Sequence, residues 1–532
     1  MPVTPSYPGV YIEETPSGVR TITGVATSIT AFIGRALRGP VDKPITINSF
    51  ADFERIFGGL WSGSSLGFAV RDFYANGGSQ AVIVRLYRAE GGAGAKPAVP
   101  QLNANNLVLE AAEPGAWGNQ LRARVEAVDP TIAGEVAPAL GVSSTDLFTL
   151  LLRDMKTGAE QMFRNVTTVE SARRVDRILA GESSLIRVKT LTAPTAHGAP
   201  AAGKTVWEDN NASDGVAAAD QASDGQDLNE DAFTGAGKEA AKQGLYALEH
   251  ADLFNLLCLP PYKSSSGIAN QDVDAGLIGA AAAYCEKRRA MLVVDPPSSW
   301  DDKGDAKSGV GSIGTRSKNA ALYFPRLVQP NPLRNGQLDQ FSPSGAVAGI
   351  LARTDATRGL WKAPAGLDAT INGAVGVSVN LTDGENGELN PLGVNCLRAM
   401  PPIGLVVWGA RTLQGDDRLA SEWKYIPVRR IALFIEESLY RGTQWVVFEP
   451  NDEPLWSQIR LNIGAFMQNL FRQGAFQGKT PAEAYFVKCD KETTTQNDIN
   501  LGIVNIVVGF APLKPAEFVI IKIQQMAGQI QA

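Results

Sequence analysis

The chain has 532 residues, of which 44% are hydrophobic and 20% are charged, and its formal net charge is −6. A chain of this length exceeds one hydrophobic core, so we expect about three domains. The acidic balance argues against nucleic acid as the main partner, because binding phosphate requires a basic face.

The four cysteines are far apart in the sequence and lie in apolar surroundings, which predicts buried thiols in a reducing cytoplasm rather than disulfides or a zinc site. They are Cys258, Cys285, Cys396 and Cys489. The N-terminus has neither the basic start nor the apolar core of a signal peptide, and no apolar run reaches the length of a membrane span. We therefore expect synthesis in the cytosol and no direct membrane insertion.

Residues 1–20 contain a short segment of strand composition, centred on Val10, Tyr11 and Ile12, between two prolines. No hairpin partner is adjacent, and an isolated strand is not stable in water. The segment is either an edge strand of the chain's own sheet or an arm that adds to the sheet of a neighbouring copy.

Residues 21–90 have the pattern of a compact α/β unit. The sequence predicts strands at 28–36 and 80–88, and helices at 50–58 and 66–78. Asn48 and Ser49 are candidate N-caps of the first helix, which Gly58 ends.

Residues 91–237 differ in composition and are bounded by two glycine-rich stretches, so we expect an inserted β-rich outer domain. Short alternating runs predict strands near 107–111, 121–128, 147–154 and 184–190. The acidic stretch 209–238 has few large apolar residues and predicts a solvated or locally disordered loop.

From residue 238 onward, helical patterns alternate with apolar runs, which indicates parallel βαβ units. We predict helices at 239–251, 271–289 and 342–359, the last capped by Ser342 or Ser344. Strands are predicted at 252–260, 290–297 and 318–329.

The region from Cys396 to Ile523 predicts a sheet covered by helices. Its apolar runs of strand length are 405–408, 445–448, 484–487, 503–510 and 518–523. A helix after residue 454 has one apolar stripe, formed by Leu455, Ile459, Ile463, Phe466 and Leu470. Off this stripe lie Ser457, Arg460, Gln468 and Arg472, which form either a solvated face or a docking face for an acidic partner.

No catalytic, cofactor-binding or metal-binding residues are predicted. A Ser–His–Asp triad needs an imidazole, but neither His197 nor His250 neighbours a G-x-S-x-G sequence, so both are interpreted as solvated or capping residues. The glycines at 309, 311 and 314 match a dinucleotide fingerprint by letters alone. They lack the preceding strand and following helix, which favours a flexible loop.

Several long segments resemble the sheath proteins of contractile tails, as found in myophages and bacterial contractile injection particles. They are PGVYIEE (8–14), ITAFIGRALRGP (29–40), SPSGAVAGILARTDATRGLWKAPAG (342–366), VVWGARTL (406–413), YIPVRRIALFIEESLYRGTQWVVFEPND (425–452) and VGFAPLKPAEFVIIKI (508–523). No such match covers 95–240, and sheaths of this kind vary most in an inserted outer domain.

The resemblance implies a non-enzymatic subunit that polymerises helically around an inner tube and contracts to drive the tube through a target envelope. It implies strand-arm exchange between copies through Val10, Tyr11, Ile12 and the tail 524–532. It places Arg460 and Arg472 on a helix that docks the tube. Further implied partners are baseplate and tail terminator or cap proteins, with assembly in the bacterial cytoplasm into a phage tail or an injection particle. The alternative is an α/β enzyme that binds a nucleotide or other substrate.

The expected fold class is therefore mixed α/β and α+β, with a central parallel α/β domain. The expected divisions are an N-terminal arm (1–20), an α/β unit (21–90), the inserted outer domain (91–237), a central domain (238–410), a C-terminal α+β domain (411–523) and a C-terminal arm (524–532).

Overall fold

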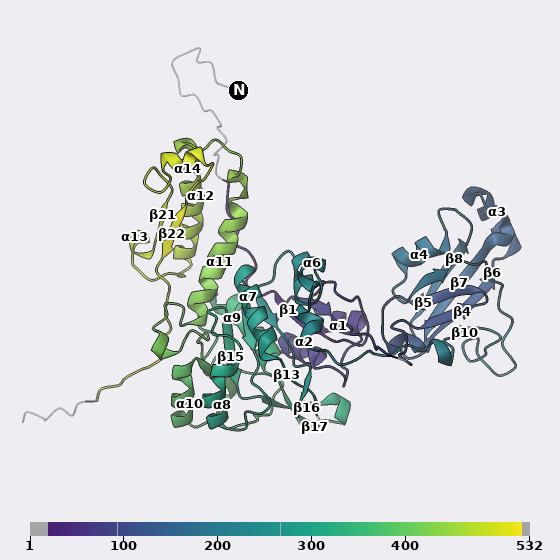
Figure 1. Ribbon diagram of the computed structural model, residues 1–532, viewed down its shortest axis with the longest axis horizontal. Coiled ribbons are helices and arrows are strands. Elements are labelled where there is room, and N and C mark those ends of the chain that lie inside the picture. The colour runs from purple at the N-terminus through teal and green to yellow at the C-terminus, as the bar shows by residue number, and fades with distance from the viewer. Residues whose placement is uncertain (1–19, 93, 266–267, 524–532) are drawn as a thin grey trace, which may run out of the picture.

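The computed structural model describes residues 20–92, 94–265 and 268–523. Three parts stand side by side (Figure 1): a central body, an upright C-terminal unit that contains α11 and α12, and an inserted module joined to the body by a narrow neck. The described chain begins beside α11, at the end of the C-terminal unit remote from the body. It ends on a segment that leaves the opposite end of the molecule.

The body is built on one eight-stranded sheet. In order across the sheet, the strands are β2 (Ile45–Ile47), β3 (Ala81–Arg85), β1 (Thr30–Gly34), β11 (Leu256–Cys258), β14 (Met291–Val294), β15 (Ala320–Phe324), β19 (Val394–Met400) and β20 (Gly404–Val407). The six inner strands are parallel, and only the two edge strands are antiparallel to their neighbours. The predicted mixed α/β class with a large parallel sheet is confirmed.

Both faces of this sheet are covered by helices, as its nearly continuous apolar strands require. Alternate residues of β1 point to opposite sides, so Phe32 packs in one core and Ala31 and Ile33 in the other. The helices on the Phe32 face are α1 (Phe50–Phe57), α2 (Leu66–Ala75) and α9 (Ser344–Arg358). Those on the other face include α7 (Ala275–Lys287), α8 (Lys303–Gly309) and α10 (Asp383–Leu389).

The predicted caps of α1 are confirmed, whereas those of α9 are wrong. Ser49 accepts a hydrogen bond from the N–H of Asp52, and Gly58 ends α1 in the left-handed conformation. At the start of α9, neither Ser342 nor Ser344 acts as a side-chain cap. The N–H of Ser344 instead donates to Asp295, which follows β14. A tertiary contact therefore supplies the acceptor that a local serine was expected to provide.

Two other predictions for the body need correction. The single strand predicted at 318–329 is two strands, β15 and β16 (Leu327–Asn331), with Pro325 between them; proline cannot donate to a ladder. Strand β16 belongs to a separate small sheet with β17 (Gln337–Phe341) and β18 (Gly376–Val377). Another small sheet pairs β12 (Lys263–Ser265) with β13 (Ile268–Asp272). The glycine-rich stretch 309–314 is not a flexible loop, because it ends α8 and continues as a 3-10 turn.

The inserted module contains the predicted strands and has its own apolar core. One sheet has the order β10 (Asp214–Gly215), β6 (Leu121–Ala127), β7 (Leu147–Asp154) and β8 (Glu160–Thr167); the other has β4 (Gln101–Ala104), β5 (Leu107–Ala111) and β9 (Ile186–Thr190). Helices α3 (Pro130–Leu140) and α4 (Val175–Glu182) accompany them.

The acidic stretch 209–238 is not a solvated loop. Ser213 is fully buried, and β10 pairs with β6. Farther along, Leu228 and Phe233 are buried in the core of the body, beside the short helices α5 (Glu230–Thr234) and α6 (Lys238–Ala241). The sequence-based division assigned Leu228 and Phe233 to the inserted module, because the apolar residues near them in the sequence are too few to indicate a core.

The C-terminal unit consists of two long helices, α11 (Ile426–Gly442) and α12 (Glu453–Arg472), packed against a hairpin of β21 (Tyr485–Lys488) and β22 (Val507–Phe510). Short helices α13 (Pro481–Ala484) and α14 (Gln496–Asn500) flank the hairpin. The predicted apolar stripe of α12 is confirmed, since all five of its residues are buried. The predicted strand 445–448 is wrong: Gln444–Val446 is a 3-10 turn, and Phe448 is fully exposed.

Candidate functional site

The first described residues are fixed along α11 and α12. The backbone N–H of Arg20 donates to Asn462 Oδ1 at 3.2 Å, and that of Val25 donates to Ser438 Oγ at 3.2 Å. Between them Ile22 is buried in the C-terminal core. Segment 20–28 is therefore the root of the N-terminal arm. Val10, Tyr11 and Ile12 lie outside the described residues.

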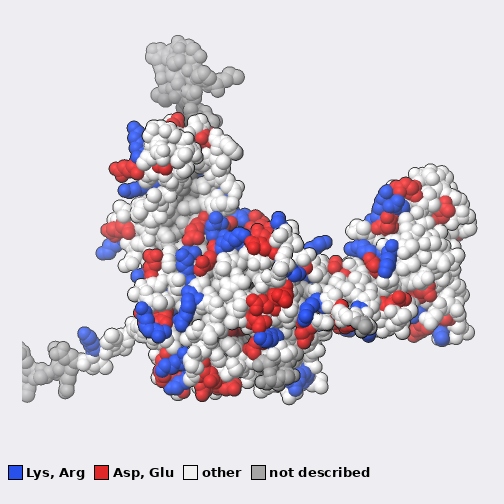
Figure 2. Space-filling view, in the orientation of Figure 1, with Lys and Arg blue, Asp and Glu red and all other residues white. Residues whose placement is uncertain are grey.

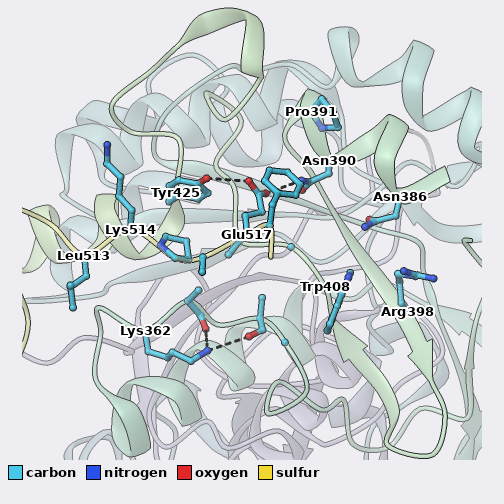
Figure 3. Close-up of a pocket in the computed structure, with 18 of the residues that line it drawn as sticks. Lys362, Asn386, Asn390, Pro391, Arg398, Trp408, Tyr425, Leu513, Lys514 and Glu517 are labelled. Carbon is cyan, nitrogen blue, oxygen red and sulfur yellow. Dashed lines mark hydrogen bonds between the residues drawn. The ribbon is translucent and has the colours of Figure 1, made fainter. Parts of the chain in front are cut away.

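The root of the C-terminal arm is held by Glu517. This carboxylate accepts two hydrogen bonds from the fully buried Arg411, from Nε to Oε1 at 2.7 Å and from Nη2 to Oε2 at 2.6 Å. Asn390 Nδ2 and the hydroxyl of Tyr425 also donate to Glu517, at 2.7 and 3.1 Å (Figure 3). Burial opposes ionisation of Glu517, but the hydrogen bonds from Arg411 and Asn390 outweigh it and lower the pKa of this carboxyl.

Beside Glu517 lies a groove of about 850 Å³, and residues 513–518 form one of its walls. Trp361 and Trp408 supply apolar surface, while Lys362, Arg398 and Lys514 supply cations. Lys362 Nζ donates to two backbone carbonyls, and Arg398 pairs with Asp383 at 2.6 Å. Figure 2 shows basic and acidic side chains intermixed over the body, with several basic groups near the point where the C-terminal segment leaves it. Aromatic and cationic walls suit an extended peptide.

Beyond Glu517, the apolar tail 518–523 has no secondary structure, contrary to the predicted strand. Its large side chains are exposed: Phe518 by 72%, Val519 by 80%, Ile520 by 83%, Ile521 by 79% and Ile523 by 92%. A strand needs a partner for its backbone groups, and the described part of this chain provides none here. Such a contiguous apolar surface marks an interaction segment.

The strands β21 and β22 offer backbone donors and acceptors that could pair with a tail of this kind from another copy. These two strands pair only with each other among the described strands, and an isolated two-stranded hairpin is marginally stable. An apolar groove of about 370 Å³ runs beside β22, lined in part by Ile435, Leu439, Ile463, Val508 and Phe510. Edge and groove together form a ready acceptor for an added strand.

Comparison with known families accounts for this combination of features. Residues 234–413 match the phage tail sheath protein central domain, and residues 420–526 match the phage tail sheath C-terminal domain; together they span more than half of the chain. The chain belongs to the phage tail sheath family. Sheath proteins of this family are structural proteins of contractile tails, not enzymes.

Curated relatives carry the same description. A putative prophage major tail sheath protein of Pseudomonas aeruginosa (strain UCBPP-PA14) is 26% identical over 291 residues, which cover 53% of this chain and 68% of the relative. The tail sheath protein of Vibrio phage KVP40 is 28% identical over 128 residues, or 24% of this chain and 19% of the relative.

Solved sheath structures share the fold. The sheath tail protein of Listeria innocua has a TM-score of 0.59 at 14% identity, covering 92% of this chain and 96% of that one. The contracted sheath of the extracellular contractile injection system PVC has a TM-score of 0.56 at 21% identity, covering 98% of each chain. The contracted helical sheath of the anti-feeding prophage has a TM-score of 0.54 at 22% identity, covering 98% and 100%.

The two predicted tube-docking residues differ in this sheath protein. Arg460 is half-buried, pairs with Glu453 at 2.6 Å and donates to the carbonyl of Cys489, so its own fold occupies it. Arg472 is exposed and has no hydrogen bond or ion pair with any described residue. The structure therefore leaves Arg472, rather than Arg460, free for a partner.

The two histidines of the sheath protein lie in different environments, and His250 is exposed at the end of a 3-10 turn. The side chain of His197 is buried rather than solvated, because it lies against the backbone of β6. Its Nδ1 accepts a hydrogen bond from the N–H of Val125, and its Nε2 lies 3.1 Å from Asp214. No cluster of three potential metal ligands occurs among residues 20–92, 94–265 and 268–523. None of the described helices has the length and apolar character to cross a membrane.

Sequence reasoning missed Arg411 and Glu517, which are 106 residues apart. The one available signal is a lone acidic residue directly before the apolar run 518–523.

Proposed function

We propose that this sheath protein polymerises into a helical sheath around an inner tube, with copies linked by exchange of terminal arms, and that contraction drives the tube through a target envelope. The names of the similar structures, a contractile injection system and a helical sheath in the contracted state, support this role. The observation that carries arm exchange is the exposed apolar tail 518–523, together with strands β21 and β22, which pair only with each other among the described strands.

The positions of the two arm roots favour an open polymer. The N-terminal root lies at the far end of the C-terminal unit, and the C-terminal segment leaves from the body (Figure 1). A copy that gives one arm at each end contacts two different neighbours through different surfaces. Such a heterologous contact, when it does not close into a ring, generates a helical filament.

The energetics favour assembly over free arms only when the contacts are repeated. Burying each large side chain of the tail contributes on the order of 1.5–3 kcal/mol. Ordering each residue costs about 1–2 kcal/mol. The net gain per arm is modest, but every copy along the filament contributes it again.

Further partners follow from the family role. We infer that α12 faces the inner tube through Arg472, with Arg460 a weaker candidate because its own fold holds it. A chain of the anti-feeding prophage baseplate shares this fold, which supports association with a baseplate. A terminator or cap protein would close the other end. Assembly in the bacterial cytoplasm, into either a phage tail or an injection particle, completes the proposal.

The test compares the full chain with truncated chains by sedimentation and negative-stain microscopy, with circular dichroism as the folding control. Removing residues 518–532 should leave a folded protein that forms no long sheaths, and removing 1–16 should do the same. Removing only 524–532 is the matched control, because it keeps the apolar run and should cause a milder defect. Tyr11→Pro should also cause a partial defect, since proline removes one backbone donor. Long sheaths from the 518–532 deletion would contradict arm exchange.

A further inference from the structure

The exposure of large apolar side chains rises sharply after Glu517. After β22, the chain stays on the molecule: the N–H of Ala511 donates to the carbonyl of Ala484 at 2.8 Å, and the carbonyl of Ala511 accepts from Gln477 at 2.9 Å. Residues 513–518 then line the groove. The side chain of Glu517 is 18% exposed, whereas the next residue, Phe518, is 72% exposed.

The group that holds Glu517 is itself rigidly built into the body. Arg411 is wholly buried, its N–H donates to Asn395 Oδ1 in β19 at 2.7 Å, and its Nη1 binds the carbonyl of Gly415 at 3.1 Å and Asp417 at 3.0 Å. The contact with Glu517 is bidentate and charge-assisted, which fixes direction as well as distance. Glu517 is thus tied through Arg411 to β19 of the main sheet.

The same residue is also tied to α11. The hydroxyl of Tyr425, the residue before α11, donates to Glu517, while the other end of α11 holds the N-terminal root through Ser438 and the contact of Gly442 with Ile22. A helix of 17 residues spans about 25 Å at 1.5 Å per residue. The N-terminal root runs along α11, from Thr27 at Arg430 to Ile22 at Gly442, so the point where the N-terminal arm leaves α11 lies at the helix end opposite to Tyr425.

We propose that Glu517 is the tether of the C-terminal arm: residues 511–517 stay with their own body, and only the chain after Glu517 crosses to a neighbour. This inference rests on the proposed arm exchange and adds where the exchange begins. A force on the C-terminal arm is transmitted through Glu517 to Arg411, beside the main sheet, and to Tyr425 at the start of α11. Helix α11 then transmits this force to the root of the N-terminal arm. Glu517 is a positioning residue in this scheme.

The competing explanation is an ordinary ion pair that stabilises the fold and has no bearing on the arm. Arg411 offers a matched control, because Asp417 is its second carboxylate partner and lies outside the arm. Glu517→Ala and Asp417→Ala each remove one carboxylate from the same guanidinium. Only the first removes the attachment of the tail.

The first experiment measures local mobility in the full-length, unassembled protein. A fluorescent dye is placed at Lys514→Cys, before the tether, or at Ile520→Cys, after it; all four native thiols are buried and do not compete. We expect high anisotropy at position 514 and low anisotropy at 520. Glu517→Ala should lower the value at 514 toward that at 520, and Asp417→Ala should leave it unchanged. Equal anisotropy at both positions in the parent protein, or an equal loss of anisotropy at 514 in both variants, would contradict the proposal that Glu517 is the tether.

Gentler variants keep the test decisive if Glu517→Ala does not fold. Tyr425→Phe and Asn390→Ala each remove one hydrogen bond to Glu517 and should give intermediate anisotropy at 514; no change in either would also overturn the proposal. In assembled sheaths, Glu517→Ala should shorten the mean length after shearing several-fold relative to Asp417→Ala. Absence of sheaths from the parent protein would contradict the proposed function alone, since the mobility measurement needs no assembly.

Discussion

Asp295 accepts two hydrogen bonds from Ser344, one from the backbone N–H and one from the hydroxyl, and both are 2.7 Å long. Asp295 follows the buried strand β14, and Ser344 begins α9. The carboxylate thus satisfies a backbone donor of the first turn from a neighbouring element, as an N-cap would. This contact joins α9 to the end of the strand beneath it.

The buried position of Asp295 predicts a pH dependence of stability. Burial raises its pKa from 3.8 to about 6, although the hydrogen bonds from Ser344 oppose the change. The folded protein therefore keeps this proton at a pH where the unfolded chain has lost it. The stability that this group contributes is full below about pH 4 and is lost as the pH rises through about 6, by roughly 3 kcal/mol in all.

Asp295→Asn should remove this component. Its free energy of unfolding, measured by urea titration, will be lower overall because one acceptor is lost. The difference between parent and variant should nevertheless shrink by roughly 3 kcal/mol between pH 4 and pH 7. A difference that is constant with pH would show that Asp295 titrates as an ordinary carboxyl.

Gly345 should tolerate no larger residue, because α9 crosses α2 there at close range. A Cβ on Gly345 would lie 2.1 Å from the carbonyl oxygen of Ala69. Gly345→Ala should lower the free energy of unfolding by more than about 2 kcal/mol, since backbone has to move. Gly387, within α10, is the control: a Cβ there meets nothing within 4 Å, so Gly387→Ala should stabilise by about 0.5–1 kcal/mol. Equal effects in thermal melts would contradict this packing.

Arg460 and Arg472 should separate folding from tube binding. Arg460→Gln removes the ion pair with Glu453 and the bond to Cys489, which should cost about 1 kcal/mol of stability. Arg472→Gln should change stability by less than about 0.5 kcal/mol, because the side chain is exposed and unpaired in the described structure. In co-sedimentation with the tube protein, Arg472→Gln should weaken binding most at low salt. Unchanged binding would remove Arg472 from the tube contact.

Most of the inserted module should be removable at its neck. The N–H of Ser223 donates to the carbonyl of Pro97 at 3.4 Å, so a short linker can join the two sides. Replacing 98–222 by a few Gly and Ser residues should give a folded protein that still forms sheaths. A folded variant that never assembles would place the module in the sheath lattice.

A longer deletion, 98–235, is the matched comparison. It also removes Leu228 and Phe233 from the core of the body. Truncating even one large core side chain costs about 2–5 kcal/mol, so this variant should not fold. Circular dichroism spectra as native-like as those of the shorter deletion would mean that these two residues are dispensable.

The sequence by itself determined the elements whose signals are local. Ser49 and Gly58 bound α1, and the spacing of Leu455, Ile459 and Ile463 gave the buried stripe of α12, because caps and periodicity depend only on near neighbours. The long apolar segments likewise carried the resemblance to the sheath family. The inserted β-rich stretch was visible for the same reason, through alternating apolar residues along each strand.

Only the tertiary structure decided how distant segments serve one another. Strand composition at 518–523 could not reveal that the chain supplies no partner for it, and nothing local pairs Arg411 with Glu517, Asp295 with Ser344 or His197 with Val125. A buried polar group takes whichever partner the fold brings to it, and that choice depends on residues tens to hundreds of positions away. The stripe of α12 shows the same limit, because periodicity placed Arg460 off the buried face, yet Glu453 and the carbonyl of Cys489 hold it to its own fold.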